Sequence, residues 1–201
     1  PRELDEHAQS ACRCALEMKR RLVDLQDRWR AEGKPIFEAR IGINTGFSVV
    51  GNFGSPERMN YTAIGDAVNL ASRLEGMNKV YGTALLIGAD TANRLDDSIV
   101  TRPIDWVAVK GKQQAVMVHE LVALTEDLDE PTRQALERYD QGLEHYRAQR
   151  FSEAIAAFEE AAELFPQGKD QPSRVMADRA RSYAETPPGE DWSGVFVATK
   201  K

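Results

Sequence analysis

The sequence predicts an α/β domain built on a mixed sheet, followed by a small all-α region. Between residues 36 and 124, segments with the two-residue period of strands alternate with segments of helical period, as in layered α/β domains. A short acidic run, 125–131, then precedes a segment rich in alanine and other helix formers. The sequence is therefore expected to form two parts joined by a linker.

The α/β part is expected to begin with a long helix. Over residues 4–31 small and apolar side chains recur at intervals of three and four, and Gly33 and Pro35 follow. Residues 36–43 then have the alternation of a strand. The further elements expected, in order, are a strand over 47–52, a strand, turn and helix over 58–76, a strand over 83–87, a helix over 89–95, and a hairpin of 100–109 with 115–124.

The run from Arg58 to Gly76 is the most informative part of the sequence. Asp66 is expected to cap the helix, because its carboxylate can accept the free N–H groups of the first turn. Gly76 is expected to end the helix in a left-handed conformation. Asn69 and Arg73 are four residues apart, so their side chains lie on one helical face. An amide beside a guanidinium can meet a ribose and a phosphate, which makes this pair a candidate nucleotide site.

The C-terminal part is predicted to be helical over 132–186 and extended over 187–201. Six of its positions have the spacing of a tetratricopeptide repeat, a helical hairpin of ~34 residues. Small side chains at two of them would let the helices approach closely, with aromatic rings filling the groove. One repeat cannot form a solenoid, because ~3 are needed, so a third helix over 173–185 is expected to cap the hairpin. The six positions are Gly142, Tyr146, Ala154, Phe158, Ala161 and Pro166.

The composition is that of an ordinary globular protein. The 201 residues are 42% hydrophobic and 29% charged, and the net charge of -6 argues against a broad nucleic-acid surface. No apolar run approaches the ~20 residues that a membrane helix needs, and no secretory signal opens the sequence. Cys12 and Cys14 fit neither a redox pair nor a zinc site. Reduced thiols predict a cytoplasmic location, although a parent protein could be membrane-anchored upstream.

Three separated motifs resemble those of the class III nucleotidyl cyclases, which make cyclic AMP or cyclic GMP. They are the run 58–76, the strand pair 40–46 with 49–55, and the hairpin 106–112 with 116–121. The resemblance covers residues 1–124 and implies a ferredoxin-like mixed sheet of the cyclase type. The family binds two metal ions through two upstream Asp motifs, and neither motif occurs in this sequence. The resemblance therefore implies a cyclase domain that is incomplete at its N-terminus and supplies no metal ligand.

The resemblance also implies roles for individual side chains. Arg73 would stabilise the charge that develops on the α-phosphate as the ribose 3′-hydroxyl attacks it, and Asn69 would orient the ribose. Thr62 would contact the purine edge, where Thr or Asp accompanies ATP in this family. Lys110, at the turn of the last hairpin, would contact the terminal phosphates, with Lys112 as a weaker candidate.

The implied function is that of an adenylate cyclase catalytic domain, which converts ATP to cyclic AMP and pyrophosphate at a homodimer interface. The reaction requires two Mg²⁺ or Mn²⁺ ions, whose ligands would come from an upstream part or from a partner chain. The alternatives are a guanylate cyclase, a cyclase-like regulatory subunit, and an interaction module whose helical tail binds a partner protein. The intact set of four side chains argues against the interaction module, because a scaffold has no physical need for them.

Overall fold

The computed structural model describes residues 4–108, 115–166, 170–189 and 191–197. Helices and strands alternate through the first part of the chain, and three helices dominate the second part, so the predicted α/β class with an all-α region is confirmed. The elements are α1 (His7–Ala31), β1 (Ile41–Ile43), β2 (Val49–Ser55), β3 (Arg58–Ile64), α2 (Asp66–Tyr81), β4 (Leu85–Gly88), α3 (Ala89–Ala92), β5 (Ile99–Ala108), β6 (Ala115–Leu124), η1 (Thr125–Asp127), α4 (Glu130–Arg147), α5 (Phe151–Leu164), α6 (Gln171–Glu185) and β7 (Val195–Val197).

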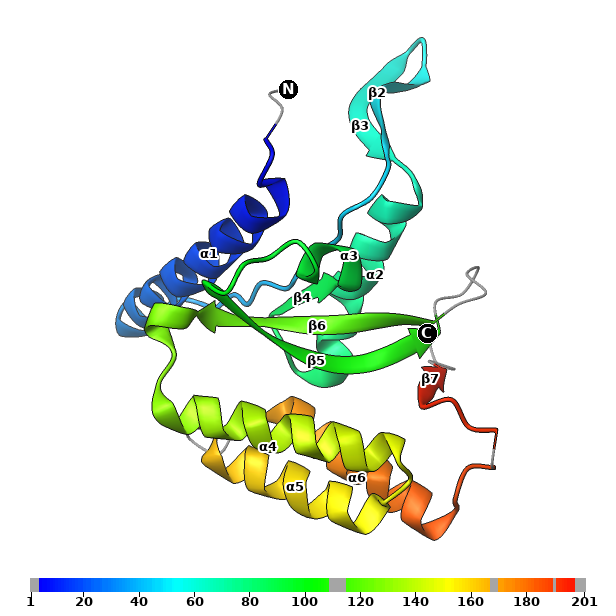
Figure 1. Cartoon of the computed structure of the whole chain (residues 1–201). Coiled ribbons are helices and arrows are strands. Elements are labelled where there is room, and N and C mark those ends of the chain that lie inside the picture. Colours follow the sequence, from blue (N-terminus) through cyan, green and yellow to red (C-terminus); the bar gives the residue numbers. More distant parts are fainter. Residues whose placement is uncertain (1–3, 109–114, 167–169, 190, 198–201) are drawn as a thin grey trace.

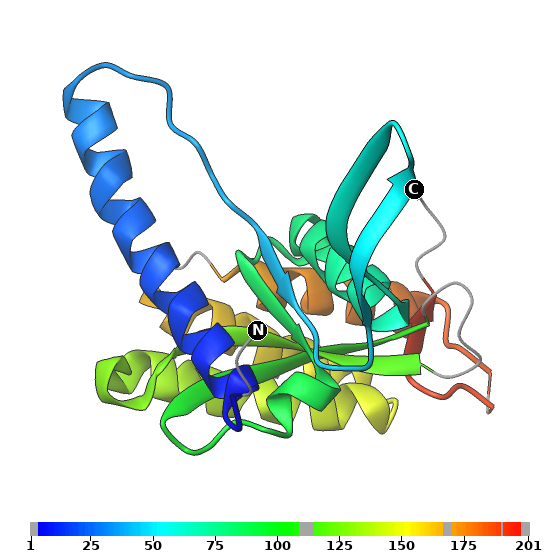
Figure 2. The same ribbon diagram turned by 90° about the horizontal axis from the view of Figure 1, so that it is seen from above.

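The main sheet is mixed and has the strand order β1-β4-β6-β5-β7. Strands β1 and β4 are parallel, as are β5 and β7, whereas β6 is antiparallel to both of its neighbours. The β5–β6 register shifts between Pro103 and Asp105, where proline cannot donate a ladder hydrogen bond. Strands β2 and β3 form a separate antiparallel hairpin, here called the arm, which stands away from the sheet in both ribbon views (Figures 1 and 2).

The two faces of the main sheet are covered by different helices. Leu85 and Ile87 of β4 pack with Cys12 and Ala15 of α1, whereas Leu86, between them, belongs to the core on the opposite side. This alternation follows from the two-residue period of a strand. Figure 1 shows α1 on one side of β5 and β6, and α4, α5 and α6 on the other.

The helical region shares one core with the sheet. Residues of α2 and β5, such as Leu74 and Ile104, belong to the same buried cluster as Tyr139 of α4, Phe158 of α5 and Met176 of α6. The division into domains at 125–131 stays a prediction, and so does the tetratricopeptide likeness. The expected close approach of two helices is present, because a Cβ on Gly142 would lie 2.6 Å from the ring of Phe158.

The tail after α6 returns to the sheet. Trp192 packs edge-on against Tyr146, with ring centroids 5.1 Å apart, and also contacts Phe151 and Tyr183. Strand β7 then pairs in parallel with the end of β5, where Val195 is opposite Trp106. Part of the predicted extended tail is therefore a sheet strand anchored by an aromatic cluster.

Both predictions for the ends of α2 were wrong. Helix α2 begins at Asp66 with Gly65 as its N-cap, and no side-chain cap bond forms; the Asp66 carboxylate lies in the first turn, where the helix dipole favours negative charge. Gly76 does not end the helix, which continues to Tyr81 and closes at Gly82 with φ 67°. The burial of Asn78 and Tyr81 outweighs the cost of about 1 kcal/mol for a mid-helix glycine.

The expected strand over 36–43 is also wrong, and so is the expected pairing of 40–46 with 49–55, because β1 pairs with β4 and β2 pairs with β3. Only Ile41–Ile43 is a strand, because β1 finds a hydrogen-bonding partner only along Leu85–Ile87 of β4 within the described residues. Alternation of side chains is not sufficient for a strand, since the backbone groups of a strand must pair with a neighbour. Residues 36–40 form no regular element, and the Phe37 ring meets Trp29 of α1 edge-on at 5.8 Å.

The two thiols are expected to react at very different rates. Cys12 is 0% exposed, and burial raises its pKa to about 11, whereas Cys14 is exposed. Because the thiolate is the reactive form, an alkylating reagent at pH 8 should modify Cys12 on the order of 100-fold more slowly than Cys14. Peptide mass spectrometry of a time course measures both rates. Equal rates in the folded chain would contradict the packing of α1, and equal rates in denaturant are the control.

His119 of β6 should make the stability of the fold dependent on pH. Burial lowers the pKa of this imidazole below its ordinary 6.5, and its Nδ1 has no hydrogen-bond partner among the described residues. The unfolded chain therefore binds the proton more tightly than the folded chain. The contribution of neutral His119 to the free energy of unfolding is fully present above about pH 6.5 and is lost as the pH falls toward the pKa of the folded state. Urea denaturation between pH 7.5 and 5.5 should show this decline. His119→Gln should flatten it, and an equal decline in that variant would contradict the assignment.

Candidate active site

Helix α2 presents the two predicted catalytic side chains on its exposed surface. Asn69 and Arg73 are both exposed, whereas the residues that follow each of them, Leu70 and Leu74, are 4% and 0% exposed. The four-residue spacing places Asn69 and Arg73 on one face. The two buried leucines fix the rotation of the helix about its axis, so the Asn69–Arg73 face is held toward solvent.

A glycine on β1 and an asparagine on α2 bring the helix and the strand into close contact. A Cβ on Gly42 would lie 2.2 Å from the carbonyl oxygen of Ala71, so only glycine fits there. Asn78 is fully buried; its Nδ2 donates to the carbonyl oxygen of Ile41 at 3.0 Å, and its Oδ1 accepts from the Thr83 hydroxyl at 2.7 Å. These contacts hold α2 against the sheet that supports the site.

The last residue of α2 belongs to a buried polar link that no motif in the sequence indicated. The Tyr81 hydroxyl donates to the Asp105 carboxylate on β5 at 2.6 Å, and Arg179 of α6 forms an ion pair with the same oxygen. Burial and the charge of Asp105 raise the pKa of Tyr81, so the phenol stays protonated and donates. The available signal was Asp105 itself, a carboxylate in an apolar strand, which requires a partner.

Thr62 lies on the arm and not on α2. It is exposed on β3 and pairs with Gly51 of β2. Because directly paired residues face the same side and every second residue shares a face, the pair Val49 and Ile64 flanks Thr62 on its face of the arm. The arm leads into α2 through Gly65 alone, so Thr62 is close in sequence to the helix that carries the other candidates. Lys110 and Lys112 lie outside the described residues.

The candidate site is an open surface of this chain. Thr62, Asn69 and Arg73 are all exposed. A hollow of about 700 Å³ lies between α1, the segment 38–41 and the end of α2, and its walls include none of these three residues. An open site of this kind suits a nucleotide that is enclosed only when a further protein surface covers it.

The residues that the structure describes do not fit a metal centre. Among them, no three His, Cys, Asp or Glu side chains gather closely enough to hold a metal ion. The candidate groups are an amide, a guanidinium and a hydroxyl, which suit ribose, phosphate and base, whereas Mg²⁺ requires oxygen ligands such as carboxylates.

Residues 1–122 match the Adenylate and Guanylate cyclase catalytic domain. The match covers more than half of the chain, so the chain belongs to this family, and the predicted resemblance is confirmed. The family includes both kinds of cyclase, so membership does not choose between ATP and GTP.

Individual relatives in this family are adenylate cyclases. The chain is 46% identical over 118 residues to "Adenylate cyclase 1" of Rhizobium meliloti (strain 1021), which is 59% of this chain and 18% of that protein. It is 37% identical over 153 residues to "Adenylate cyclase, terminal-differentiation specific" of Dictyostelium discoideum, which is 74% of this chain and 7% of that protein. The crystal structure of the adenylyl cyclase CyaB from P. aeruginosa superposes with a TM-score of 0.53 and 39% identity, over 61% of this chain and 62% of that one.

The matched segments are small parts of these relatives. The chain spans less than a fifth of the length of either curated relative. The Dictyostelium match covers 74% of the chain, so wherever it begins it extends past residue 124 into the helical region. Within the described ranges, no helix is both long and apolar enough to cross a lipid bilayer.

Proposed function

We propose that this chain supplies one half of an adenylate cyclase active site, the half that binds the ribose, α-phosphate and purine of ATP. In the reaction the ribose 3′-oxygen loses its proton to a base and bonds to the α-phosphorus. The bond from that phosphorus to the oxygen that bridges to the β-phosphate breaks, and pyrophosphate leaves. Arg73 would stabilise the charge that accumulates on the α-phosphoryl oxygens, because its planar fork suits phosphate.

The observation that carries the proposal is the exposed pair of Asn69 and Arg73 on a helix whose opposite face is fixed. Leu70, Leu74 and Asn78 are 4%, 0% and 0% exposed, so α2 cannot rotate without disrupting the core. Such preorganisation matters because a group that stabilises a transition state must already be in place when charge develops. Asn69, one turn before Arg73, would bond the ribose and align its 3′-hydroxyl for attack.

Thr62 favours ATP over GTP in this proposal. Its hydroxyl can donate to or accept from the edge of a purine, and the apolar pair Val49 and Ile64 on the same face of the arm can cover the ring. Family members that use ATP carry Thr or Asp at this position by the resemblance stated above. Lys110 would contact the terminal phosphates and ease the departure of pyrophosphate.

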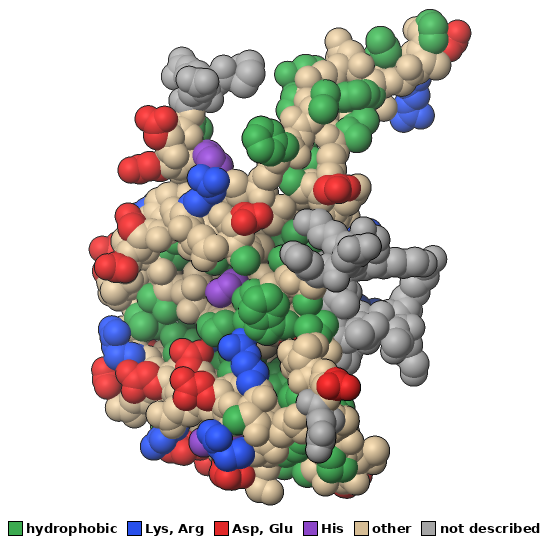
Figure 3. Space-filling model, turned by 45° about the vertical axis from the view of Figure 1, so that its right-hand side comes forward, with side chains coloured by type: hydrophobic (Ala, Val, Ile, Leu, Met, Phe, Trp, Pro, Cys, Tyr) green, Lys and Arg blue, Asp and Glu red, His purple; other side chains and the backbone are tan. Residues whose placement is uncertain are grey.

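A second chain would complete the site by contributing the carboxylates for two Mg²⁺ or Mn²⁺ ions. The arm offers a surface for such a chain, because hydrophobic side chains gather along it (Figure 3). Six of them are 50% or more exposed, and large exposed apolar patches mark interaction sites. They are Phe47 just before the arm, and Val49, Val50, Met59, Tyr61 and Ile64 within it.

The proposal is tested by complementation. The chain is mixed with a cyclase chain that keeps its metal carboxylates but carries alanine at its own positions equivalent to Asn69 and Arg73. Cyclic AMP formation from Mn²⁺-ATP is expected only in the mixture, with GTP a poorer substrate. If the mixture is inactive while the unaltered partner is active alone, the proposal is wrong. A higher rate with GTP than with ATP would mean that the completed site is that of a guanylate cyclase. Turnover by this chain alone would show that it holds metal ligands of its own.

The arm is expected to mediate association of two copies. Met59 and Tyr61 are 59% and 69% exposed and lie on the arm face opposite Thr62, so replacing both by threonine keeps strand propensity and leaves the candidate site intact. Burying such a side chain contributes about 1.5–3 kcal/mol, so the dissociation constant of the homodimer should rise at least about tenfold. Sedimentation velocity over a concentration series measures it. Val23→Thr on α1, at a residue 51% exposed, is the control; equal effects of both changes would contradict the assignment.

A further inference from the structure

Helix α6 of the C-terminal helical region touches the end of the active-site helix directly. Gly82, the C-cap of α2, has φ 67°, and a Cβ on it would lie 2.4 Å from Cγ of Gln171. Gln171 is the first residue of α6. The end of α2 is therefore packed against a helix that lies outside the cyclase part of the chain.

A second contact between the same helices runs through a buried carboxylate. Oδ2 of Asp105 accepts from the Tyr81 hydroxyl at 2.6 Å and is ion-paired with Arg179, eight residues after Gln171 on α6. The Arg179 and Asp105 side chains are 10% and 3% exposed. A buried carboxylate needs a compensating partner, and here the cation that pairs with it comes from the helical region.

The same carboxylate also fixes the strand below it. Oδ1 of Asp105 accepts from its neighbouring backbone N–H at Trp106, at 2.8 Å. Strand β5 ends two residues later, at Ala108. The carboxylate held by Arg179 thus joins the last turn of helix α2 to the last residues of strand β5.

We propose that Arg179 is a positioning residue for the active-site helix. By pairing with the Asp105 carboxylate and holding it in place, Arg179 holds the Tyr81 hydroxyl and so fixes the end of α2, the helix from whose exposed face Asn69 and Arg73 project. The catalytic consequence rests on the proposed function, but the mechanical link does not. The helical region thus helps to align Asn69 and Arg73 in the active site.

The link acts on α2 far from the catalytic side chains. Asn69 and Tyr81 are twelve residues apart on one helix, which is about 18 Å at 1.5 Å per residue. A helix released at one end tilts about its remaining contacts, so a small movement at Tyr81 displaces the far end by a similar distance. Misplacement of a catalytic group by about 1 Å can lower a rate roughly 100-fold.

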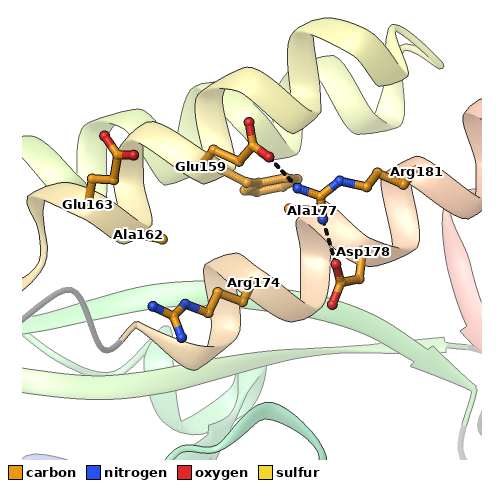
Figure 4. Close-up of a pocket in the computed structure, with 8 residues that line it drawn as sticks. Glu159, Ala162, Glu163, Arg174, Ala177, Asp178 and Arg181 are labelled. Carbon is orange, nitrogen blue, oxygen red and sulfur yellow. Dashed lines mark hydrogen bonds and ion pairs between the residues drawn. The ribbon is translucent and has the colours of Figure 1, made fainter.

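Two variants break the link at different points. Arg179→Gln removes the cation and keeps hydrogen-bonding groups, while Tyr81→Phe removes only the hydroxyl and leaves the Asp105–Arg179 pair in place. Arg179→Lys keeps the charge without the planar fork and is the conservative variant. The matched control is Arg181→Gln, because Arg181 lies on the same helix but is ion-paired on the surface with Glu159 and Asp178 and faces α5, not the sheet (Figure 4).

The first readout is amide hydrogen exchange of the whole chain, followed by mass spectrometry of peptides. Arg179→Gln and Tyr81→Phe are expected to speed exchange in α2 about tenfold, with β4 and β6 unchanged. Arg179→Lys should fall between wild type and Arg179→Gln, and Arg181→Gln should match wild type. If Arg179→Gln leaves α2 as in the control, or loosens the sheet and α2 alike, the positioning role is overturned.

The second readout is turnover in the complementation assay. Both variants are expected to lower kcat about tenfold with little change in KM, because Asn69 and Arg73 act in the transition state. If kcat falls only in proportion to the fraction of chain that is unfolded, the positioning role is overturned. If wild type itself shows no turnover in the mixture, the proposed function has failed, and the exchange experiment still decides whether Arg179 positions α2.

Discussion

Replacing Arg73 by alanine is expected to lower turnover in the complementation assay by about 100- to 1,000-fold, the range seen when a preorganised group that stabilises a developing oxyanion is removed. The effect should fall on kcat, because the guanidinium meets its full partner charge only as the α-phosphorus becomes five-coordinate. The fold should survive, since Arg73 is exposed and alanine is the best helix former.

The control for this prediction is a cation on the same helix. Lys79 is exposed near the end of α2, so Lys79→Ala removes one positive charge without touching the Asn69–Arg73 face. It should leave kcat within about threefold of wild type, because exposed charges further apart than a Debye length of about 10 Å are screened. Equal losses in both variants would mean that the net charge of the surface matters and not the placement of Arg73.

Asn69→Ala should act in the same assay but less strongly. Orientation of the ribose contributes through proximity and alignment, and a single neutral hydrogen bond contributes about 0.5–1.5 kcal/mol, so a loss of about tenfold is expected. Circular dichroism should show no loss of helix, because alanine is a better helix former than asparagine. If Asn69→Ala has the kcat of wild type, Asn69 is not part of the active site.

The elements with a strong local pattern were predictable from the sequence. The bounds of β5 and β6 differ by one residue or less from the expected 100–109 and 115–124, because the strand-like alternation of side chains is clear in both segments. The placement of Asn69 and Arg73 on one face of a helix follows from their spacing alone. The roles of these residues stay proposals, because no local pattern shows what they bind.

What the sequence could not reveal depends on residues far apart in the chain. Gly76 looked like a helix end, yet α2 continues because Tyr81 finds Asp105, 24 residues further on. Arg179 reaches the same carboxylate from 74 residues away. Periodicity describes the neighbours of a residue within its own element, so contacts of this kind are invisible to it. The helical region therefore resembled an appendage in sequence but is part of the core in the structure.

The largest effect on stability is expected at Arg102, which joins the helical region to the sheet. This side chain of β5 is 1% exposed, and its Nη1 and Nη2 donate to the two carboxylate oxygens of Asp170 at 2.6 and 2.9 Å. Nε donates to Glu120 of β6 at 3.0 Å, and the ring of Tyr139 lies 4.7 Å from the guanidinium carbon. Burial alone would lower the pKa of Arg102, but Glu120 and Asp170 outweigh it and raise the pKa, so the group is always charged.

Arg102→Ala is therefore expected to destabilise the fold by about 3–5 kcal/mol, the cost of leaving a buried partner charge unpaired. Total stability of such domains is about 5–15 kcal/mol, so a large part of the folding free energy would be lost. Urea denaturation monitored by circular dichroism measures the change. Arg138→Ala is the control, because Arg138 pairs with Glu160 on the surface, where the two side chains are 44% and 50% exposed, and should cost less than about 1 kcal/mol.

A double replacement separates the loss of the ion pair from the loss of packing. Asp170 also caps α6, since its carboxylate accepts from the backbone N–H of Ser173 at 3.1 Å, and asparagine can keep that cap. Arg102→Met with Asp170→Asn removes both charges and retains the apolar volume of the arginine stem. Because position 170 then carries no buried unpaired charge, whereas Glu120 loses its partner in both variants, the double variant should be more stable than Arg102→Met alone. If the double variant is the less stable of the two, the ion pair itself is not what Arg102 contributes, and its packing against Tyr139 and Phe165 is.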